Sequence, residues 1–430
     1  MNVDDLTLLA RRKQVLGSGT PLFYDEPLHL VRGEGVWVYD AQGSAYLDVY
    51  NNVPHVGHCH PYVVEAVSRQ LATLNLNTRY LHENVVNYGE RLTATTSFEK
   101  AGVFFTCTGT ESNELALRIA RHLTGGTGIL ASSFNYHGNS AVLASLCTAF
   151  PVPEKFPDFA RLIRMPEPYR DRQGRSDADL ASYYLDEARA AIASLEASGV
   201  KLAALLIDPS FANEGLPDFV PGYLIGLVDL VHKAGGIVIA DEVQSGFGRT
   251  GAAMWAHQLH GIVPDIITTG KPMGNGFPLG SVMAAYDVVN EFGTAANYFN
   301  TFGGNPVATA AGAAVLDVIE QEALIANAAA TGAYVRQGLE VLMGRHECIG
   351  NVRSRGMFFG LELVSDRTTK APSPDLAKRI VNVMKDKGVL ISRIGQYDNI
   401  LKMRPAMVFK PEQADILLGA LEETLTEVAR

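Results

Sequence analysis

The sequence predicts an α/β protein in which a mainly parallel β-sheet is covered by helices on both faces. The main observation is a series of short apolar runs, each followed by a loop and then by a helical pattern. These runs are VFFT (103–106), GILA (128–131), AALLI (203–207), IVIA (237–240) and DIIT (265–268). Buried apolar strands that alternate with helices are typical of parallel sheets. The segment YLIGLVDLVHKAGG (223–236) is one such helix, and it lies between the third and fourth runs.

A second observation separates the chain into parts. With 430 residues, of which 47% are hydrophobic, the chain can bury a large core and more than one domain. After about residue 310, alanine-rich helical patterns lead to the strand FFGLELV (358–364), a further helix and the segment ILKMRPAMVF (400–409). This order indicates a smaller α+β domain.

The N-terminal part predicts a β-hairpin. The stretch GVWVYDAQGSAYLDVY (35–50) reads as two strands around the turn Ala41–Gln42–Gly43. We expect residues 1–60 to form an N-terminal segment and hairpin that join the small domain. Residues 61–310 are then the large domain, and residues 311–430 are the C-terminal small domain.

The charge and the apolar content of the chain disfavour two classes of partner, nucleic acids and membranes. Lys and Arg number 36 against 46 Asp and Glu, a formal charge of −10 with no block of like charge, so we expect no nucleic-acid partner. No apolar run approaches the roughly 18 residues that span a bilayer, so we expect no membrane partner. The N-terminus lacks the basic start and long apolar stretch of a signal peptide. The four cysteines are far apart and form no CxxC pair. We therefore expect reduced thiols and a cytoplasmic location.

Ligands of open parallel sheets lie at the carboxyl ends of the strands, so the residues that follow each run are the site candidates. Gly109 and Thr110 follow the first run and open a helix, where backbone N–H groups and the helix dipole suit a phosphate; an ordinary capped helix would look the same. Tyr136 and His137 follow the second run, and they could stack on a flat ligand or serve packing alone.

Two charged residues follow the later runs. Asp241 ends the fourth run, where a buried carboxylate needs a cationic partner such as Arg249 or a protonated ring nitrogen. Lys271 follows the fifth run and precedes proline and several glycines. A lysine in a half-buried cleft loses its proton more readily and can form a Schiff base.

Together these positions supply a phosphate cradle, a stacking aromatic ring, an acid for a pyridinium nitrogen and a Schiff-base lysine. Pyridoxal 5'-phosphate requires these parts. The sequence therefore predicts pyridoxal 5'-phosphate as the cofactor.

Longer motifs make the prediction more specific. They are TGTESNELALR (108–118), FNYHG (134–138), IVIADEVQSGFGRTG (237–251), TTGKPMGNGFPLG (268–280) and NTFGGNPVATAAG (300–312). Through them nearly the whole chain resembles the class III aminotransferases, which are pyridoxal-phosphate-dependent enzymes of fold type I. The resemblance implies a large domain with a mainly parallel, seven-stranded type of sheet and a smaller α+β domain.

The resemblance also implies roles for individual residues. Lys271 would hold the cofactor covalently, and Asp241 would pair with its ring nitrogen. Gln244 would contact the ring hydroxyl, while Val243 and Tyr136 would cover the two ring faces, with His137 beside them. Gly109 and Thr110 would bind the cofactor phosphate. Thr301 would reach that phosphate from the neighbouring subunit, so a homodimer, or a tetramer built from dimers, would have its active sites at the subunit interface.

One segment departs from the family pattern. Class III aminotransferases commonly carry E-P-x-Q-G-E-x-G after the third strand, and its second Glu often pairs with an arginine near the C-terminus. This chain reads DPSFANEG (208–215), with Phe211 in the Gln place and Asn213 in the Glu place. The missing carboxylate disfavours transamination.

Other stretches resemble a subgroup, the ethanolamine-phosphate phospho-lyases. They are YNNVPHVGHCHP (50–61), LNLNTRYLHENVV (74–86), GKPMGNGFP (270–278), FNTFGGNPV (299–307) and ILKMRPAMVF (400–409). The resemblance implies elimination of phosphate and ammonia from O-phosphoethanolamine or a similar phosphorylated amine, giving an aldehyde such as acetaldehyde. The alternative is an ω-aminotransferase that moves an amino group from an amine or amino acid to a 2-keto acid. A non-catalytic cofactor-binding protein is disfavoured because Lys271, Asp241 and Tyr136 are all present.

A phosphorylated substrate needs cations, and Arg79 and Arg404 are the first candidates because a guanidinium gives a phosphate two parallel hydrogen bonds. Lys402 and the run Arg11–Lys13 are weaker candidates, and a structural ion pair is an open alternative for any one of them. Asn52 is a further substrate candidate. We expect no metal at the cluster His55, His58, Cys59 and His60, which lacks a distant second pair of ligands.

Overall fold

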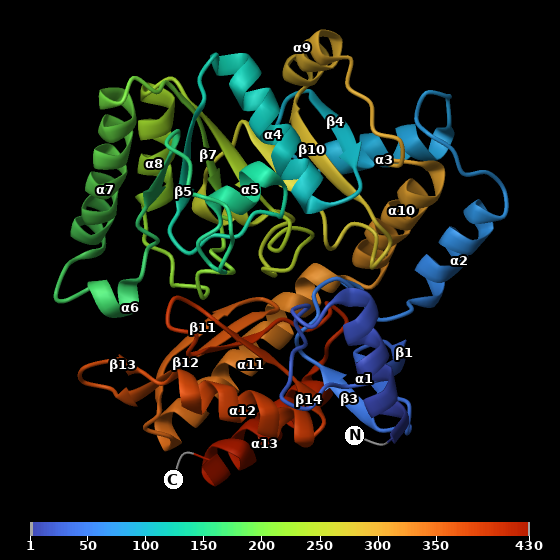
Figure 1. Ribbon diagram of the computed structural model, residues 1–430, viewed down its shortest axis with the longest axis vertical. Coiled ribbons are helices and arrows are strands. Elements are labelled where there is room, and N and C mark those ends of the chain that lie inside the picture. The colour runs from blue at the N-terminus through green and yellow to red at the C-terminus, as the bar shows by residue number, and fades with distance from the viewer. Residues whose placement is uncertain (1–2, 429–430) are drawn as a thin grey trace.

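The computed structural model describes residues 3–428, which form a larger part around one sheet and a smaller part below it (Figure 1). The helices are α1 (Val3–Leu16), α2 (Pro61–Leu71), α3 (Glu83–Thr93), α4 (Gly109–Thr124), α5 (Ala141–Leu146), α6 (Pro168–Asp171), α7 (Asp177–Ala197), α8 (Tyr223–Lys233), α9 (Tyr286–Ala296), α10 (Pro306–Gln321), α11 (Leu324–Arg345), α12 (Pro374–Asp386) and α13 (Pro411–Val428), with a 3₁₀ turn at Ala256–His260. In the described part of the chain, no helix combines the length and apolar character needed to span a membrane.

The larger part contains a seven-stranded sheet of order β4-β10-β9-β8-β7-β5-β6. Its strands are β4 (Ala101–Thr106), β5 (Gly128–Ser132), β6 (Ala160–Ile163), β7 (Leu202–Ile207), β8 (Ile237–Asp241), β9 (Ile266–Thr269) and β10 (Gly280–Ala285). Strands β6, β5, β7, β8 and β9 pair in parallel, whereas β10 runs antiparallel to β4 and β9. The predicted mainly parallel sheet is confirmed, and the five predicted runs coincide with β4, β5, β7, β8 and β9, except that Asp265 precedes β9.

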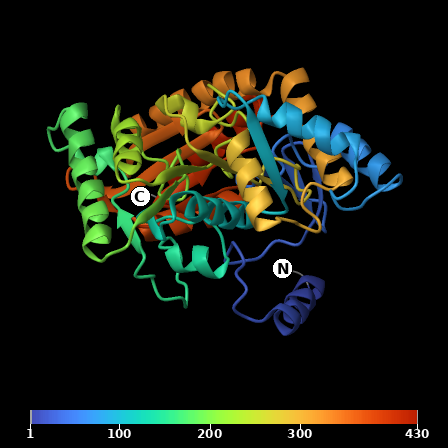
Figure 2. The same ribbon diagram turned by 90° about the horizontal axis from the view of Figure 1, so that it is seen from above.

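Helices cover both faces of this sheet because the strands alternate their apolar side chains between them. In β7, Ala204 and Leu206 share a core with α4, whereas Leu205 and Ile207 share another with α7 and α8. Helix α4 begins at the cap Thr108 and ends at Gly125, whose φ of 64° is a left-handed conformation that glycine adopts readily. Figure 2 shows α4 lying along the sheet, while α1 stands away from the rest of the molecule.

The smaller part contains two sheets. The first joins β1 (Leu30–Glu34), β2 (Trp37–Asp40), β3 (Ala45–Asp48) and β14 (Val389–Leu390), and the second joins β11 (Ile349–Arg355), β12 (Phe358–Asp366), β13 (Ala371–Pro372), β15 (Ser392–Ile394) and β16 (Ile400–Met403). The predicted hairpin is present, because β2 and β3 are antiparallel. Strand β3 also pairs in parallel with β14. Residues 1, 2, 429 and 430, the outer ends of the expected segments 1–60 and 311–430, lie outside the described residues.

Basic side chains of the small-domain strands hold the loop that follows β7, residues 208–217, here called the β7 loop. Arg353 donates to the carbonyl oxygen of Gly215 at 2.9 Å and pairs with the carboxylate of Glu167 at 2.9 Å and with that of Glu362. Arg355 donates to the carbonyl oxygens of Ser210 and Pro217. Lys402 donates to the carbonyl oxygen of Ala212. The small domain therefore fixes the backbone of a loop that belongs to the large domain.

We expect Arg353→Met to lower the free energy of unfolding by about 3–5 kcal/mol, because it leaves the buried Glu167 without its ion-pair partner, although Glu362 keeps Arg170. Urea denaturation followed by circular dichroism measures the change. The control is Arg336→Met, which removes an exposed pair with Glu340 on α11 and should cost less than about 0.5 kcal/mol. Equal losses in the two variants would contradict the role of Arg353.

Candidate functional site

A cavity of 330 Å³ opens at the carboxyl ends of the parallel strands. Its wall consists of Val53, Cys107, Thr108, Gly109, Thr110, Asn113, Tyr136, His137, Gly138, Asp208, Asp241, Val243, Gln244, Gly270, Lys271, Gly276, Phe277, Pro278 and Leu279. All the sequence-predicted cofactor residues except Thr301 therefore meet in one wall.

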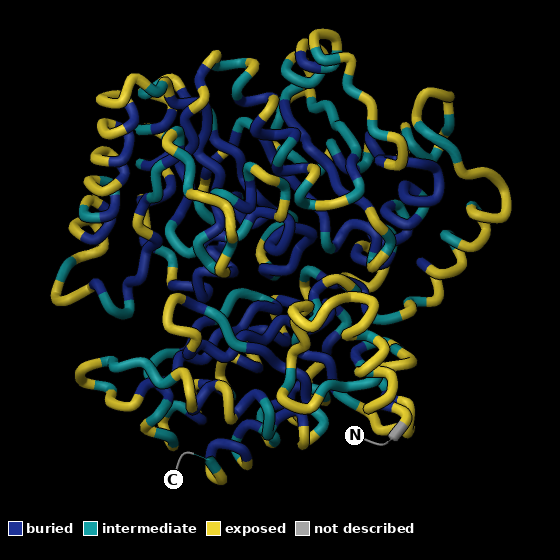
Figure 3. The backbone as a smooth tube through the Cα atoms, viewed as in Figure 1, coloured by how far each residue is buried: buried dark blue, intermediate teal, exposed yellow. Residues whose placement is uncertain are grey.

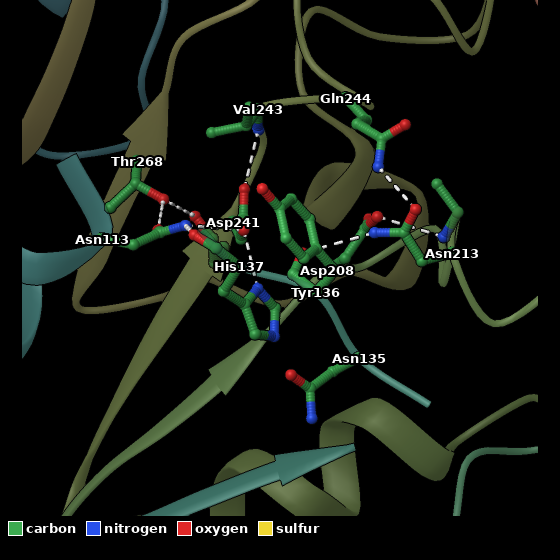
Figure 4. Close-up of polar contacts among 12 residues, drawn as sticks. Asn113, Asn135, Tyr136, His137, Asp208, Asn213, Asp241, Val243, Gln244 and Thr268 are labelled. Atoms are coloured by element: carbon green, nitrogen blue, oxygen red, sulfur yellow. Dashed lines mark hydrogen bonds and ion pairs between the residues drawn. The ribbon is translucent and has the colours of Figure 1, made fainter. Parts of the chain in front are cut away.

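Asp241 ends β8 as a buried carboxylate with three hydrogen-bond donors (Figure 4). Its Oδ2 accepts from Asn113 Nδ2 at 2.8 Å and lies 2.7 Å from His137 Nδ1, and its Oδ1 accepts from the backbone N–H of Val243 at 3.0 Å. Burial alone would lower the pKa of His137, but the hydrogen bond and the charge of Asp241 raise it above its ordinary value. These donors offset the cost of burying the carboxylate.

The structure corrects one sequence expectation, because Arg249 is not the partner of Asp241. Its buried guanidinium donates to the carbonyl oxygens of Met357 and Pro405 at 3.3 and 2.8 Å and lies 3.1 Å from His55 Nδ1. The turn after β8 carries Arg249 toward the small domain, away from the cavity.

The start of α4 borders the cavity at Gly109 and Thr110. A Cβ at position 109 would lie 2.8 Å from both Cγ atoms of Val243, so glycine permits the close approach of α4 to the loop after β8. The first turn of a helix has N–H groups without intrahelical partners and a positive dipole end. This part of the wall is suited to an anion.

Lys271 lies two residues beyond β9 and is partly buried in the wall. Burial lowers the pKa of its amine, and the positive charge of Arg404 lowers it further, while the carboxylates of Asp241 and Asp208 act in the opposite sense. A lowered pKa makes the neutral, nucleophilic amine more abundant.

Gln244 lies between a cation and a neutral amide. Its Nε2 donates to Asn213 Oδ1 at 3.2 Å, and its Oε1 accepts from the guanidinium of Arg404. Asn213 in turn donates to the carbonyl oxygen of Tyr136 at 3.3 Å (Figure 4). The Tyr136 ring makes an edge contact with Phe150, with centroids 5.4 Å apart. This chain fixes the amide of Gln244 and the backbone behind Tyr136.

Two basic side chains lie behind this part of the wall. Arg404 is buried and donates from Nε to the carbonyl oxygen of Tyr50 at 2.8 Å. Lys402 is also buried, and its burial together with the charge of Arg404 puts the pKa of its amine well below the ordinary value. Within residues 3–428, no carboxylate lies at ion-pair distance from Lys402 or Arg404, and Asn213, which contacts Gln244, is a neutral amide.

Three other sequence-predicted residues lie outside the wall. Arg79 is exposed, and its guanidinium carbon lies 3.7 Å from the ring centroid of Phe299. Thr301 is exposed on the segment that follows Phe299. Asn52 is buried, and its Nδ2 has no hydrogen-bond partner among the described residues. A single chain therefore does not bring Arg79 or Thr301 to the cavity.

The histidine cluster near the hairpin is dispersed among different partners. His55 Nε2 lies 2.8 Å from the carbonyl oxygen of Phe247, His58 Nε2 lies 2.8 Å from Asp48 Oδ2, and His60 Nε2 lies 3.0 Å from Glu322 Oε1. Each ring therefore serves a separate structural contact.

Sequence reasoning missed Asp208 and Asn113 as wall residues. Asp208 follows β7 directly, and burial together with the charge of Asp241 raises the pKa of its carboxyl to about 6. Its place after an apolar strand is the same signal that identified Asp241. Asn113 lies one turn inside α4, and nothing in its local sequence distinguishes it from an ordinary helix residue.

Comparisons with known proteins find relatives that are named for different activities. The family model described as Aminotransferase class-III matches residues 24–425. A Drosophila melanogaster protein named alanine--glyoxylate aminotransferase 2-like is 39% identical over 97% of this chain and 86% of its own length. A phospholyase from Arthrobacter, solved in complex with phosphoethanolamine, is 48% identical with a TM-score of 0.94, covering 97% of this chain and 99% of that one. An amine transaminase from an uncultivated Pseudomonas species, solved in a PLP-bound form, is 29% identical with a TM-score of 0.86, covering 94% and 96%.

We expect Lys271, in the protein stripped of small molecules, to react with an acylating reagent at a lower pH than an ordinary lysine. The reagent attacks only the neutral amine, whose share rises with pH through the pKa, and that pKa is lowered from 10.5. Peptide mass spectrometry after brief labelling across a pH series measures half-maximal modification, with exposed Lys13 as the internal reference. Half-maximal labelling of Lys271 at or above pH 10.5 would contradict the lowered pKa.

Proposed function

The chain belongs to the class III aminotransferase family, and from this premise we propose that it is a pyridoxal-phosphate-dependent phospho-lyase. Its substrate is O-phosphoethanolamine or a similar phosphorylated amine. The C–O bond to phosphate breaks as a proton leaves the amine-bearing carbon. The released enamine takes up one water to give an aldehyde, acetaldehyde in the case of phosphoethanolamine, and ammonia.

The wall residues fit pyridoxal 5'-phosphate, the cofactor of this family. When bound, the cofactor supplies a covalent amine acceptor and an electron sink for the substrate. Gly109 and Thr110 at the start of α4 hold its phosphate. Asp241, held in place by its three donors, would pair with the ring nitrogen. Val243 and Tyr136 cover the ring, and Gln244 and His137 orient the groups around it.

Lys271 has two tasks in this proposal. Its amine holds the cofactor between turnovers and then removes the proton from the amine-bearing carbon of the substrate. Both tasks need the neutral amine, which burial and the nearby Arg404 favour. Withholding that proton from the cofactor favours departure of the phosphate over amino transfer.

The observation that carries the choice of elimination is the neutral Asn213 in a place where a carboxylate would accompany transamination. Asn213 hydrogen-bonds to Gln244 and to the Tyr136 carbonyl, and among residues 3–428 no carboxylate lies at ion-pair distance from Arg404, which donates to the same Gln244. An alkyl phosphate is a dianion near neutral pH, and unneutralised cations suit it. The likeness to the Arthrobacter phospholyase supports the same choice.

The alternative is an ω-aminotransferase, and the Drosophila relative favours it, because it is named as an aminotransferase-like protein and matches nearly the whole chain. In that case the cations would receive the carboxylate of a 2-keto acid. The two activities differ in product and can be assayed on one preparation.

We further propose a homodimer, or a tetramer of dimers, located in the cytoplasm. The support for assembly is a group of exposed large apolar side chains, among them Tyr80, Leu81 and Phe302. The support for location is the set of four separate, unpaired cysteines. Neither a nucleic acid nor a membrane is part of the proposal.

We expect Asp241→Asn to keep the fold and to lower turnover on the order of 100-fold or more, because the ring nitrogen loses its charged partner. Circular dichroism checks the fold, and steady-state phosphate release measures turnover. Asp287→Asn on the exposed start of α9 is the matched control and should leave turnover unchanged. Near-normal activity of Asp241→Asn would remove Asp241 from the proposed role.

We expect the purified protein to release inorganic phosphate and acetaldehyde from phosphoethanolamine, and to leave ethanolamine unchanged, because the site selects a dianion. Arg404→Ala should raise the transition-state free energy behind kcat/KM for phosphoethanolamine by about 1.5–3 kcal/mol, because Gln244 loses the charged donor that orients its amide. Lys410→Ala, at an exposed position, is the control. Fast turnover of alanine or 4-aminobutyrate with a keto-acid acceptor, without phosphate release, would establish the aminotransferase instead.

A further inference from the structure

We propose that Arg79 acts in trans, so that its guanidinium binds the substrate phosphate in the cavity of a second copy of this chain. The inference rests on the proposed function and names the source of one cation of that same site. It follows from the position of Arg79, from the surface around it, and from the place where that surface meets the cavity.

Arg79 has an oriented but unneutralised charge. Its guanidinium carbon lies 3.7 Å from the ring centroid of Phe299, and its backbone N–H donates to Asn77 Oδ1 at 3.1 Å. In residues 3–428, no carboxylate lies at ion-pair distance from this side chain. A cation stacked on an aromatic ring keeps its N–H groups available to an anion. The cavity of its own chain does not include Arg79 in its wall.

The surface around Arg79 is unusually apolar for one that faces water. The segment between α2 and α3 is exposed over nearly its whole length (Figure 3), and its Leu81 side chain is 101% exposed and Tyr80 is 66% exposed. Across from this segment, Phe302 is 70% exposed. A second cavity, of 460 Å³, lies between these segments and is lined mainly by apolar side chains, including Val86, Phe105 and Phe299. We call residues 71–86 and 298–303 together the loop surface.

The loop surface begins at the rim of the active cavity. Asn300 lies 3.8 Å from the sulfur of Cys107, which is a wall residue, and donates to the carboxylate of Glu111 at 3.1 Å. Glu111 belongs to the first turn of α4, beside Gly109 and Thr110. Whatever covers the loop surface therefore also lies against the rim of the cavity.

We take a second copy of the chain as the occupant, because it can cover the apolar loop surface and also lie against the cavity rim. In a two-fold dimer the same patch meets itself, so the loop surface of each copy lies against the cavity rim of the other. Side chains that project from this surface, Arg79 and Thr301, are then delivered to the partner's cavity. The large exposed apolar side chains of the loop surface are buried in the same step.

The charges of the wall show what the partner supplies. The basic residues of the described wall are Lys271 and His137. Lys271 is assigned to the chemistry, and His137 lies 2.7 Å from Asp241. Arg404 lies behind Gln244, to which it donates. A dianionic substrate therefore gains a directly exposed cation when Arg79 of the second copy enters.

Mixed dimers test the inference. Two differently tagged chains are co-expressed, and the dimers that carry both tags are purified in the holo form. The first mixed dimer pairs Lys271→Ala with Arg79→Ala. The second pairs the unmodified chain with a chain that carries both substitutions. Phosphate release from phosphoethanolamine gives KM and kcat, inhibition by inorganic phosphate gives a separate binding constant, and sedimentation gives the assembly state.

If Arg79 acts in trans, the first mixed dimer keeps one complete site and about half the activity of the unmodified dimer. The second mixed dimer has no complete site. Its kcat/KM, counted per site that still has Lys271, falls about 10- to 100-fold, and inhibition by phosphate weakens in parallel. If Arg79 acts within its own chain, the two results exchange, and the inference is overturned while the proposed phospho-lyase stands.

Two other outcomes also overturn the inference. One is a fully active Arg79→Ala dimer, and the other is an active monomer. Absence of phosphate release by the unmodified protein would overturn the inference and the proposed function together.

As a check on folding, Arg79→Lys should restore part of the affinity in trans, because it returns the charge without the planar fork.

Discussion

The buried carboxylate of Asp241 is the interaction on which the rest of the site depends. A charge in this position is costly unless donors surround it, and its three donors come from the loop after β5, from α4 and from the residue two positions along its own chain. Asn113 extends the network, because its Oδ1 accepts from Thr268 of β9 at 2.6 Å and its Nδ2 also donates to the carbonyl oxygen of His137. Three strands and a helix are thereby held in one relative position, with Lys271 just beyond the last strand.

Around this centre, charge is separated in space. Burial raises the pKa of Glu214 to about 7, with a further contribution from Asp208, whose own pKa is raised to about 6. On the other side, the buried guanidinium of Arg404 donates to the neutral amide of Gln244. A guanidinium without a carboxylate at ion-pair distance, opposite acids whose pKa is raised, is an arrangement that suits an anionic substrate.

Much of this arrangement could be predicted from the sequence, because chain order and strand ends determine it. The apolar runs located five strands, and the residues after them gave Gly109, Tyr136, Asp241 and Lys271. The prediction that Arg249 pairs with Asp241 was wrong because a local sequence pattern does not show the direction in which a turn projects a side chain. The contact of Arg404 with Gln244 could not be found, since it joins positions 160 residues apart. Strand β10 was missed because GSVMAA has little β-branched character.

The hydrogen bonds from the small domain to the β7 loop determine when that loop can take up its final structure during synthesis. The loop carbonyls find their partners in Arg353, Arg355 and Lys402, which lie between 138 and 190 residues further along the chain. Asp241 and Lys271 leave the ribosome well before those side chains exist. The nascent large domain can assemble its sheet, but the loop beside the cavity acquires its final backbone only when the last strands have emerged. The chain thus becomes able to bind a ligand only near the end of translation. A chain truncated before residue 402 contains Asp241 and Lys271 but lacks a side chain that holds the β7 loop beside them.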